Sequence, residues 1–424
     1  MSMATQRPPV PVVVLQHCED GAVLANTRAG LVEAPQVKLH QLGRLDERLA
    51  AHLDGLFVAG EFGMHASEHA MARAGTGESF VAAALAIAHR DMERIDRLLA
   101  AAEAADALRT GVVLAFCWAD AAQLRGLVAQ LLDSPSSFRR QIGLTLCPAH
   151  LVDPGVVLER AIGAVEAPLR AQAYQAAGAC GRTGLLADCL AGLGDADMAC
   201  RFQAAQSSVR LGDRGAAVEA LSALTQEEGP YRAPAFDLLF RLATFAQAAP
   251  FLKALLDSPD DLRMAIRGAG TLGDPQSVPW LIEQMGSPQL GRLAGESFSM
   301  ITGLDLAALD LERKPPGDVA AGPDDDPEND DVAMDEDEGL PWPEPERIRT
   351  WWSGNAQDFS PGTRFFMGAP PSWSHCMQVL RSGFQRQRIA AAEHLCLLVP
   401  GTLLFPTNAP AWRQSQWLAQ MVDA

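Results

Sequence analysis

Residues 195–213 read DADMACRFQAAQSSVRLGD, and residues 257–274 read DSPDDLRMAIRGAGTLGD. In each segment an aspartate precedes an arginine by six positions, small or apolar residues follow, and a Gly-Asp pair ends the segment. Both belong to a stretch from about Leu131 to Met285 in which arginines recur every 31 residues, at Arg139, Arg170, Arg201, Arg232 and Arg263. A fixed period of this length is typical of a helical solenoid, in which each repeat buries its apolar face only against its neighbours.

The same spacing predicts a series of helical hairpins with short loops rich in Gly, Asp and Pro. The first helices of five hairpins are expected to begin near Ser137, Pro168, Ala199, Tyr231 and Asp261. Their second helices are expected at about 154–164, 184–193, 215–226, 247–257 and 276–286. Helical patterns outside this stretch predict further helices at about 12–28, 39–59, 78–90, 91–104, 107–118, 121–132, 346–356, 372–382, 384–398 and 412–421.

Composition divides the chain into four regions. We expect an N-terminal helical region at 1–77, the repeat solenoid at 78–312, an acidic Pro-rich linker at 313–346 and a C-terminal helical region at 347–424 that continues or caps the solenoid. The linker composition cannot bury a core, so this segment is expected to be disordered. An alternative is that the linker is a tether that shields a basic surface, its own or a partner's.

The overall charge argues against a nucleic-acid partner. The 424 residues carry a net charge of −18, and ten acidic residues lie between Asp324 and Glu338; without them the net charge is still −8. A phosphate backbone is repelled by such a chain unless a local basic strip compensates, and the sequence shows no such strip. Apolar residues make up 48% of the chain and aromatic residues only 6%, which favours closely packed helices over a sheet-rich fold.

The cysteines and the apolar runs indicate a cytoplasmic protein. None of the eight cysteines forms a C-x-x-C pair, and most lie in apolar helical runs, where a thiol behaves as a small hydrophobe. The N-terminal residues lack a signal-peptide pattern. Since no segment reaches the roughly 20 apolar residues that a membrane helix needs, no membrane partner is expected.

The repeat pattern resembles HEAT repeats, which implies an all-α α-solenoid of helical hairpins. The resemblance also implies a ladder in which an aspartate in the turn pairs with the arginine that starts the next helix. The residues that match the ladder are the pairs Asp133 and Arg139, Asp195 and Arg201, and Asp257 and Arg263. Arg170 and Arg232 lack this aspartate, and are expected to reach the acid of a neighbouring repeat.

The whole chain is also similar to an uncharacterised proteobacterial family of HEAT-repeat proteins that are often encoded among type VI secretion genes. The resemblance is carried by segments near both ends, including Leu45-Asp46-Glu47-Arg48-Leu49, Leu340-Pro341-Trp342-Pro343, Pro361-Gly362-Thr363-Arg364 and Pro410-Ala411-Trp412-Arg413. It implies a secretion context but no activity.

One motif points to metal chemistry. His65 and His69 with Glu68 spell H-x-x-E-H, the inverted zinc-protease order, although the sequence does not determine a third ligand. The alternative is two ordinary histidines on a helix surface. Iron hydroxylases with HEAT-like folds use His-Glu pairs, whereas Glu68-His69 and Glu393-His394 have the opposite order and lie far apart. We therefore expect no catalytic residue, metal or cofactor.

The leading hypothesis is a non-catalytic protein–protein interaction scaffold, as an adaptor, chaperone or immunity partner in type VI secretion. The alternatives are a HEAT-like enzyme, either a lyase or a metal-dependent hydroxylase, and a nucleic-acid-binding HEAT-like protein. Tryptophans cluster near the C-terminus, where they either pack or bind. The candidate interaction residues are Trp342, Trp351, Trp352, Arg364, Arg386 and Arg388. The partner and the oligomeric state are left open.

Overall fold

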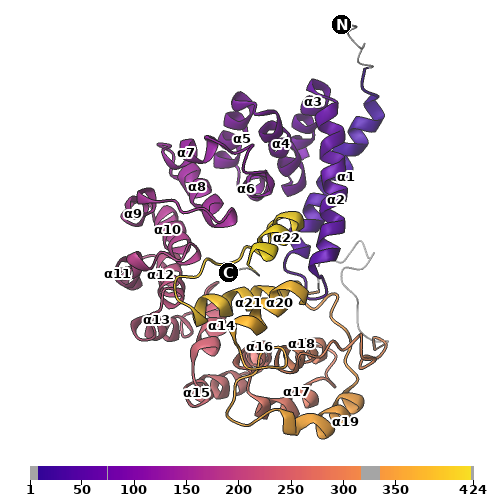
Figure 1. The fold of residues 1–424 in the computed structure, drawn as a ribbon, viewed down its shortest axis with the longest axis vertical. Helices are drawn as coiled ribbons and strands as arrows, with labels where there is room; N and C mark the ends of the chain where they lie inside the picture. The colour runs from indigo at the N-terminus through magenta and orange to yellow at the C-terminus, as the bar shows by residue number, and fades with distance from the viewer. Residues whose placement is uncertain (1–7, 74, 317–334, 422–424) are drawn as a thin grey trace. The chain divides into compact units, whose positions relative to one another are not determined.

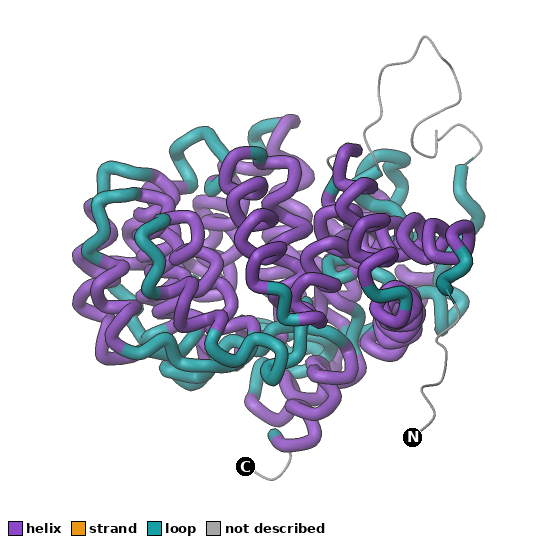
Figure 2. The backbone as a smooth tube through the Cα atoms, turned by 90° about the horizontal axis from the view of Figure 1, so that it is seen from above, coloured by secondary structure: helices purple, strands orange, loops and turns teal. Residues whose placement is uncertain are grey.

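The computed structural model describes residues 8–73, 75–316 and 335–421. Over these residues the protein is all-α, with 22 α-helices, six short 3-10 helices and no β-strand (Figure 1). The tube in Figure 2 accordingly shows helices joined by loops. Isolated bridges join Glu312 with Pro343 and Phe366 with Ala369. None of the described helices is long and apolar enough to cross a lipid bilayer.

The chain forms two compact units, and each is described by itself. Unit 1 comprises Met1–Leu185 with Thr402–Ala424, and unit 2 comprises Leu186–Gly401. These units follow different boundaries from the predicted regions 1–77, 78–312, 313–346 and 347–424, because the last 23 residues belong to the same unit as the first helices.

Unit 1 contains eleven of the described α-helices. They are α1 (Pro11–Leu31), α2 (Leu39–Val58), α3 (Glu61–Ala70), α4 (Thr76–His89), α5 (Met92–Ala104), α6 (Asp106–Trp118), α7 (Leu127–Leu132), α8 (Ser137–Ala149), α9 (Val156–Ile162), α10 (Ala167–Ala179) and α22 (Ala411–Gln420). Helix α4 is the centre of its core, since every residue from Ser79 to Ile87 is buried. Small residues let the neighbours approach: a Cβ atom added to Gly111 of α6 would lie 2.1 Å from the Thr76 carbonyl oxygen.

Unit 2 contains the other eleven. They are α11 (Leu186–Ala191), α12 (Met198–Arg210), α13 (Ala216–Leu224), α14 (Arg232–Leu242), α15 (Phe245–Leu256), α16 (Leu262–Leu272), α17 (Val278–Gln284), α18 (Gly291–Thr302), α19 (Pro345–Asn355), α20 (Trp373–Ser382) and α21 (Gln385–Leu398). Consecutive helices pack in pairs, and α14, α16 and α18 also pack side by side. Gly268 in α16 allows this approach, because a Cβ atom there would lie 2.5 Å from the Phe240 ring.

Local side chains fix where many helices begin. Asp197 accepts a hydrogen bond at 2.9 Å from the backbone amide of Cys200, and Ser136 accepts one at 3.2 Å from that of Arg139. Such caps satisfy amides that lack a partner in the first turn of a helix. Of the predicted first helices, α8 and α12 have such a cap and α10, α14 and α16 do not. All five begin within one residue of the position that the 31-residue spacing predicts.

Part of the predicted linker packs against unit 2. Residues 317–334, the part of the linker that contains most of the acidic run, lie outside the described residues, so the predicted disorder there stays a prediction. Residues 335–346 are placed: the side chain of Asp337 is 3% exposed, and Leu340 and Trp342 are buried. The Trp342 carbonyl oxygen also accepts a hydrogen bond from the backbone amide of Arg313 at 2.8 Å. These residues can pack despite their charge because arginines neutralise the carboxylates.

Candidate binding surface

The repeated arginines of unit 2 all lie in the first turn of a helix, and each guanidinium reaches forward along the chain. Arg201 donates to Glu227 at 2.9 Å, and Arg232 donates to both carboxylate oxygens of Asp261 at 2.6 and 3.0 Å. Arg263 donates to the carbonyl oxygen of Gln289 at 3.0 Å. Each of these acceptors lies 26 or 29 residues further along the chain, in the turn before the first helix of the next hairpin. The contacts therefore join successive hairpins.

The repeated arginines of unit 1, Arg139 and Arg170, have different partners from those of unit 2. Arg139 pairs with Asp96 at 2.6 Å, rather than with Asp133, and the forward contact is made by Arg140, which lies 3.7 Å from Glu166. Arg170 donates to two carbonyl oxygens of the turn that precedes its own helix. A guanidinium has five donors in a planar fork, so it can bind turn carbonyls and a carboxylate together.

The aspartates of the predicted ladder stand in the turns, but another acid carries the pairing with Arg263. Its carboxylate partners are Asp337 and Glu336, at 2.7 and 3.1 Å, and not Asp257, which is the C-terminal cap residue of α15. Asp195 also serves its own turn, because its carboxylate accepts the backbone amide of Asp197 at 2.9 Å.

Four arginines of α16, α18 and α21 bind one short acidic segment; we call Arg263, Arg267, Arg292 and Arg386 the arginine surface. Asp337 takes two hydrogen bonds from Arg263, at 2.7 and 3.0 Å, and its backbone carbonyl accepts from Arg292 at 3.0 Å. Arg292 also pairs with the Asp335 carboxylate. Charge-assisted bonds to guanidinium groups are the strong class of hydrogen bond.

The middle residue of the acidic segment, Glu336, lies between three of these arginines. Its carboxylate is 3.1 Å from Arg263 and 3.4 Å from Arg267, and its backbone carbonyl oxygen is 3.3 Å from Arg386. The side chain nevertheless stays 67% exposed, and that of Arg267 stays 49% exposed. The outer part of the arginine surface is therefore open to solvent.

A pocket of about 320 Å³ adjoins the arginine surface. It is lined by residues of α14, α16, α18 and α21, among them Arg267 and Arg386. Arg386 donates to the Glu296 carboxylate at 2.9 Å. Burial raises the pKa of Glu296, and the neighbouring Arg386 opposes that rise. The Glu296 carboxylate and the Arg386 guanidinium therefore stabilise each other in the wall of the pocket.

The far side of this pocket is a second polar cluster. Asp237 accepts two hydrogen bonds from Arg241, at 3.0 and 3.2 Å, and one from the Thr271 hydroxyl at 2.9 Å. Arg241 also lies 3.5 Å from the buried His394 ring. Burial, followed by the charges of Arg241 and Arg364, keeps the pKa of His394 well below its usual value, so this imidazole is neutral at pH 7.

The predicted interaction residues lie in different environments. Of them, Arg386 lines the pocket. Trp342 is buried, with the Arg292 guanidinium 4.7 Å from its ring centre, and Trp351 and Trp352 are partly buried against the core of unit 2. Arg388 is fully buried and donates to the Leu380 carbonyl oxygen at 2.7 Å. Burial lowers the pKa values of Arg364 and Arg388 to about 10.

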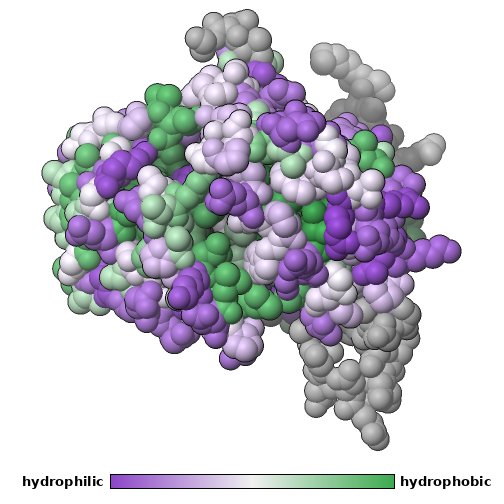
Figure 3. All heavy atoms as spheres, turned by 90° about the horizontal axis from the view of Figure 1, so that it is seen from below, coloured by the Kyte–Doolittle hydropathy of each residue, from purple (hydrophilic) through white to green (hydrophobic). Residues whose placement is uncertain are grey.

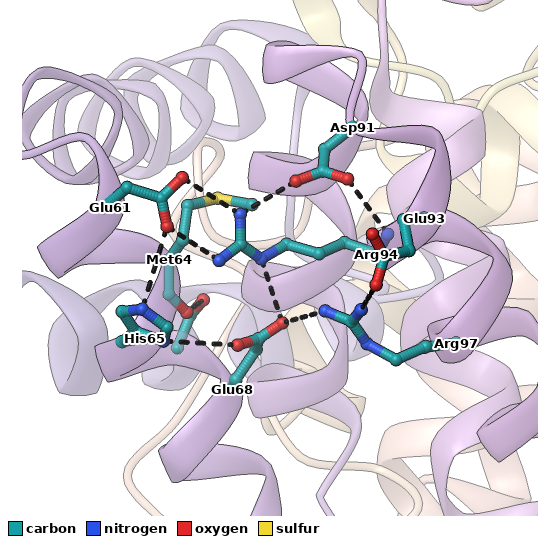
Figure 4. A network of polar contacts seen from close by, with 9 residues as sticks. Glu61, Met64, His65, Glu68, Asp91, Glu93, Arg94 and Arg97 are labelled. Carbon is teal, nitrogen blue, oxygen red and sulfur yellow. Dashed lines mark hydrogen bonds and ion pairs between the residues drawn. The ribbon is translucent and has the colours of Figure 1, made fainter.

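The H-x-x-E-H motif lies on α3, in the network of Figure 4. Glu68 accepts hydrogen bonds from Arg94 at 3.1 Å and from Arg97 at 3.2 Å, and Arg94 also binds Glu61 and Asp91. The carboxylate of the motif, Glu68, therefore binds guanidinium groups. No three His, Cys, Asp or Glu side chains among the described residues are placed to hold a metal ion. In unit 2, Glu393 likewise pairs with Arg210, at 2.7 Å.

Apolar surface offers a weaker indication of a site. On the face drawn in Figure 3, apolar side chains form small groups and bands between polar ones. Soluble proteins carry such scattered apolar groups without a binding role.

Comparisons of the chain with family models, with curated proteins and with solved structures gave no match.

Sequence analysis missed the arginine surface because its members are spread over 124 positions, from Arg263 to Arg386. The acidic run was the one feature of the sequence that pointed to this surface. One interpretation of that run was that it shields a basic surface of the same chain.

Proposed function

We propose that this chain is a non-catalytic protein-binding scaffold whose arginine surface binds an acidic segment of another protein. One observation carries the proposal: the carboxylates of the chain's own Asp335, Glu336 and Asp337 are bound there by the guanidinium groups of Arg263, Arg267 and Arg292. A surface that holds one acidic peptide in this way fits a second of similar charge, and the covalently attached segment competes with it.

The architecture supports a scaffold. Helices that follow one another with an arginine in the first turn of each first helix are compatible with a HEAT-like α-solenoid, and we propose that architecture on this ground. Such arrays offer a series of similar surfaces to an extended partner. The whole-chain resemblance makes a type VI secretion component or effector the expected partner, with the chain as its adaptor, chaperone or immunity protein.

The buried cysteines give no support to an enzyme that works through a thiol. Burial raises the pKa values of Cys117, Cys147 and Cys376 to about 11 and those of Cys180, Cys189 and Cys396 to about 12, so these thiols stay protonated at neutral pH. A protonated thiol is a poor nucleophile and a poor metal ligand.

The test measures binding of a fluorescein-labelled peptide with the sequence of residues 331–340, DVAMDEDEGL. Full-length protein is compared with the variant Asp335→Asn, Glu336→Gln, Asp337→Asn. The variant is expected to bind the peptide about fivefold to tenfold more tightly, because its own segment no longer competes for the arginines. Higher ionic strength is expected to weaken that binding.

Two further proteins complete the experiment. Asp257→Asn, Asp260→Asn, Glu283→Gln makes the same change of charge at exposed positions of unit 2, and is expected to bind as the unmodified chain does. Adding Arg263→Ala and Arg267→Ala to the neutralised variant is expected to abolish the gain. Equal peptide affinity in the neutralised and unmodified proteins would overturn the proposal, and tighter binding of duplex DNA than of the peptide would favour the nucleic-acid alternative.

A further inference from the structure

A second pocket, of about 340 Å³, lies in unit 1 where α22 meets α2, α4 and the end of α6. Three aromatic side chains, Phe57, Trp118 and Trp412, line it together with two carboxylates, Asp54 and Asp120. The remaining lining is small or apolar, apart from one glutamine, and none of the lining residues is basic. A cavity of this size suits a small organic molecule.

The two indoles form walls at right angles. The ring centroids of Trp118 and Trp412 are 4.6 Å apart and their planes meet at 88°. The face of an indole carries negative potential, so a cation near such a pair is attracted by the rings. Trp118 already attracts one cation in the fold, because the Arg28 guanidinium lies 5.2 Å from its ring, with Asp46 as counter-ion at 2.7 Å.

These walls are held in place by buried polar contacts. Arg413, next to Trp412, donates to the carbonyl oxygens of Cys117, Trp118 and Ala119 at 2.9, 2.8 and 2.6 Å. It thereby binds carbonyl oxygens that have no partner within the helix at the C-terminal end of α6. Phe57, which also lines the pocket, stacks on His89 with ring centroids 4.2 Å apart. A pocket that is rigid before binding loses less entropy when a ligand enters.

Asp54 and Asp120 supply the charge. Both side chains are exposed. The Asp120 carboxylate also interacts electrostatically with Arg413 and His150. The backbone amide of Asp120 donates to Gln123 at 2.9 Å, which fixes the loop but leaves the carboxylate available. The pocket thus combines aromatic walls with a negatively charged rim, the combination that recognises ammonium ions.

We propose that this pocket binds a small organic ammonium ion, with the cationic group against Trp118 and Trp412 and its charge facing Asp54 and Asp120. The group recognised is a substituted ammonium on a short apolar chain, either free or carried by a lysine side chain. An aromatic pocket without the carboxylates would accept neutral apolar molecules equally well, so the preference for charge is the property to test.

Isothermal titration calorimetry of the full chain with choline, and with its neutral carbon isostere 3,3-dimethylbutan-1-ol, separates these cases. Saturable binding of choline and at least tenfold weaker binding of the alcohol are expected. A trimethyllysine-containing tripeptide forms the second arm. Binding of either cation supports the site, and the ratio of their affinities shows whether the source is a free amine or a side chain. Equal affinity for choline and the alcohol, or binding of neither cation, would overturn the proposal.

Three variants locate the binding. Asp54→Asn with Asp120→Asn is expected to weaken choline binding about tenfold without loss of helix content, because both side chains are exposed. Trp412→Leu is expected to abolish binding, with circular dichroism as the check on folding. Glu47→Gln, an exposed acid on α2 outside the pocket, is expected to change nothing. Choline binding that survives the double aspartate change unaltered would place the ligand elsewhere and refute the assignment.

Discussion

Asp46 and Arg28 form a buried ion pair, with 2.7 Å between the Arg28 Nε and an Asp46 carboxylate oxygen. The second carboxylate oxygen accepts the backbone amide of Ala411 at 2.6 Å. One side chain therefore joins α1, α2 and the start of α22. Because Asp46 is 0% exposed, removing either partner leaves an uncompensated buried charge.

Replacing Asp46 is expected to destabilise unit 1 strongly. Asp46→Ala is expected to lower the free energy of unfolding by about 3 kcal/mol or more, since Arg28 keeps its charge but loses its counter-ion. Urea unfolding followed by circular dichroism measures the effect, and Glu47→Gln, the exposed neighbour, is the matched control. An unchanged unfolding midpoint in Asp46→Ala would show that the pair contributes nothing.

The repeated arginines are expected to matter less than a buried pair in the same unit. The Arg201 side chain is 25% exposed and binds Glu227 at 2.9 Å. The Arg210 side chain is 7% exposed and donates three hydrogen bonds to Glu393. Arg201→Ala is therefore expected to cost about 1 kcal/mol and Arg210→Ala about 3 kcal/mol. Chemical unfolding of both proteins tests the order, and a larger loss in Arg201→Ala than in Arg210→Ala contradicts it.

Stability is expected to fall as the solution is acidified, with a contribution from His150. Burial, and next the charge of Arg413, lowers the pKa of His150 from 6.5 to about 4. Between these values the unfolded chain binds a proton that the folded chain does not, so stability decreases as the pH falls from about 6.5 to about 4. Melting temperatures across that window measure it.

The variant His150→Gln isolates this contribution. It is expected to show a shallower loss of stability between pH 6.5 and pH 4, because the group that takes up the proton on unfolding is gone. Melting profiles that run parallel for the two proteins would assign the acid sensitivity to other groups.

Local patterns in the sequence were enough to predict the helices but not the contacts of their side chains. The 31-residue period placed the starts of α8 to α16 because caps and apolar spacing are local properties. The partner of Arg139 could not be predicted, since Asp96 lies 43 residues away and Asp133 was the nearer acid. The predicted helix at 121–132 begins only at Leu127, after a turn with the left-handed Gly126.

The two pockets were harder to predict for the same reason. Trp118 and Trp412 meet although 293 residues separate them in the chain, and neither carries a motif that indicates the other. Residues 335–342 were assigned to a linker on composition alone. Composition does not show that Arg263 and Arg292, on two different helices, neutralise Asp335 and Asp337.

The tie between Asp46 and Ala411 has a consequence for synthesis on the ribosome. The two residues are 365 positions apart, and all of unit 2 is translated between them. At 5–20 residues per second, about 20 to 70 s pass before the amide that completes this contact exists. During that interval the nascent N-terminal helices expose the surface that α22 later covers, so a chaperone could bind there until the chain is finished.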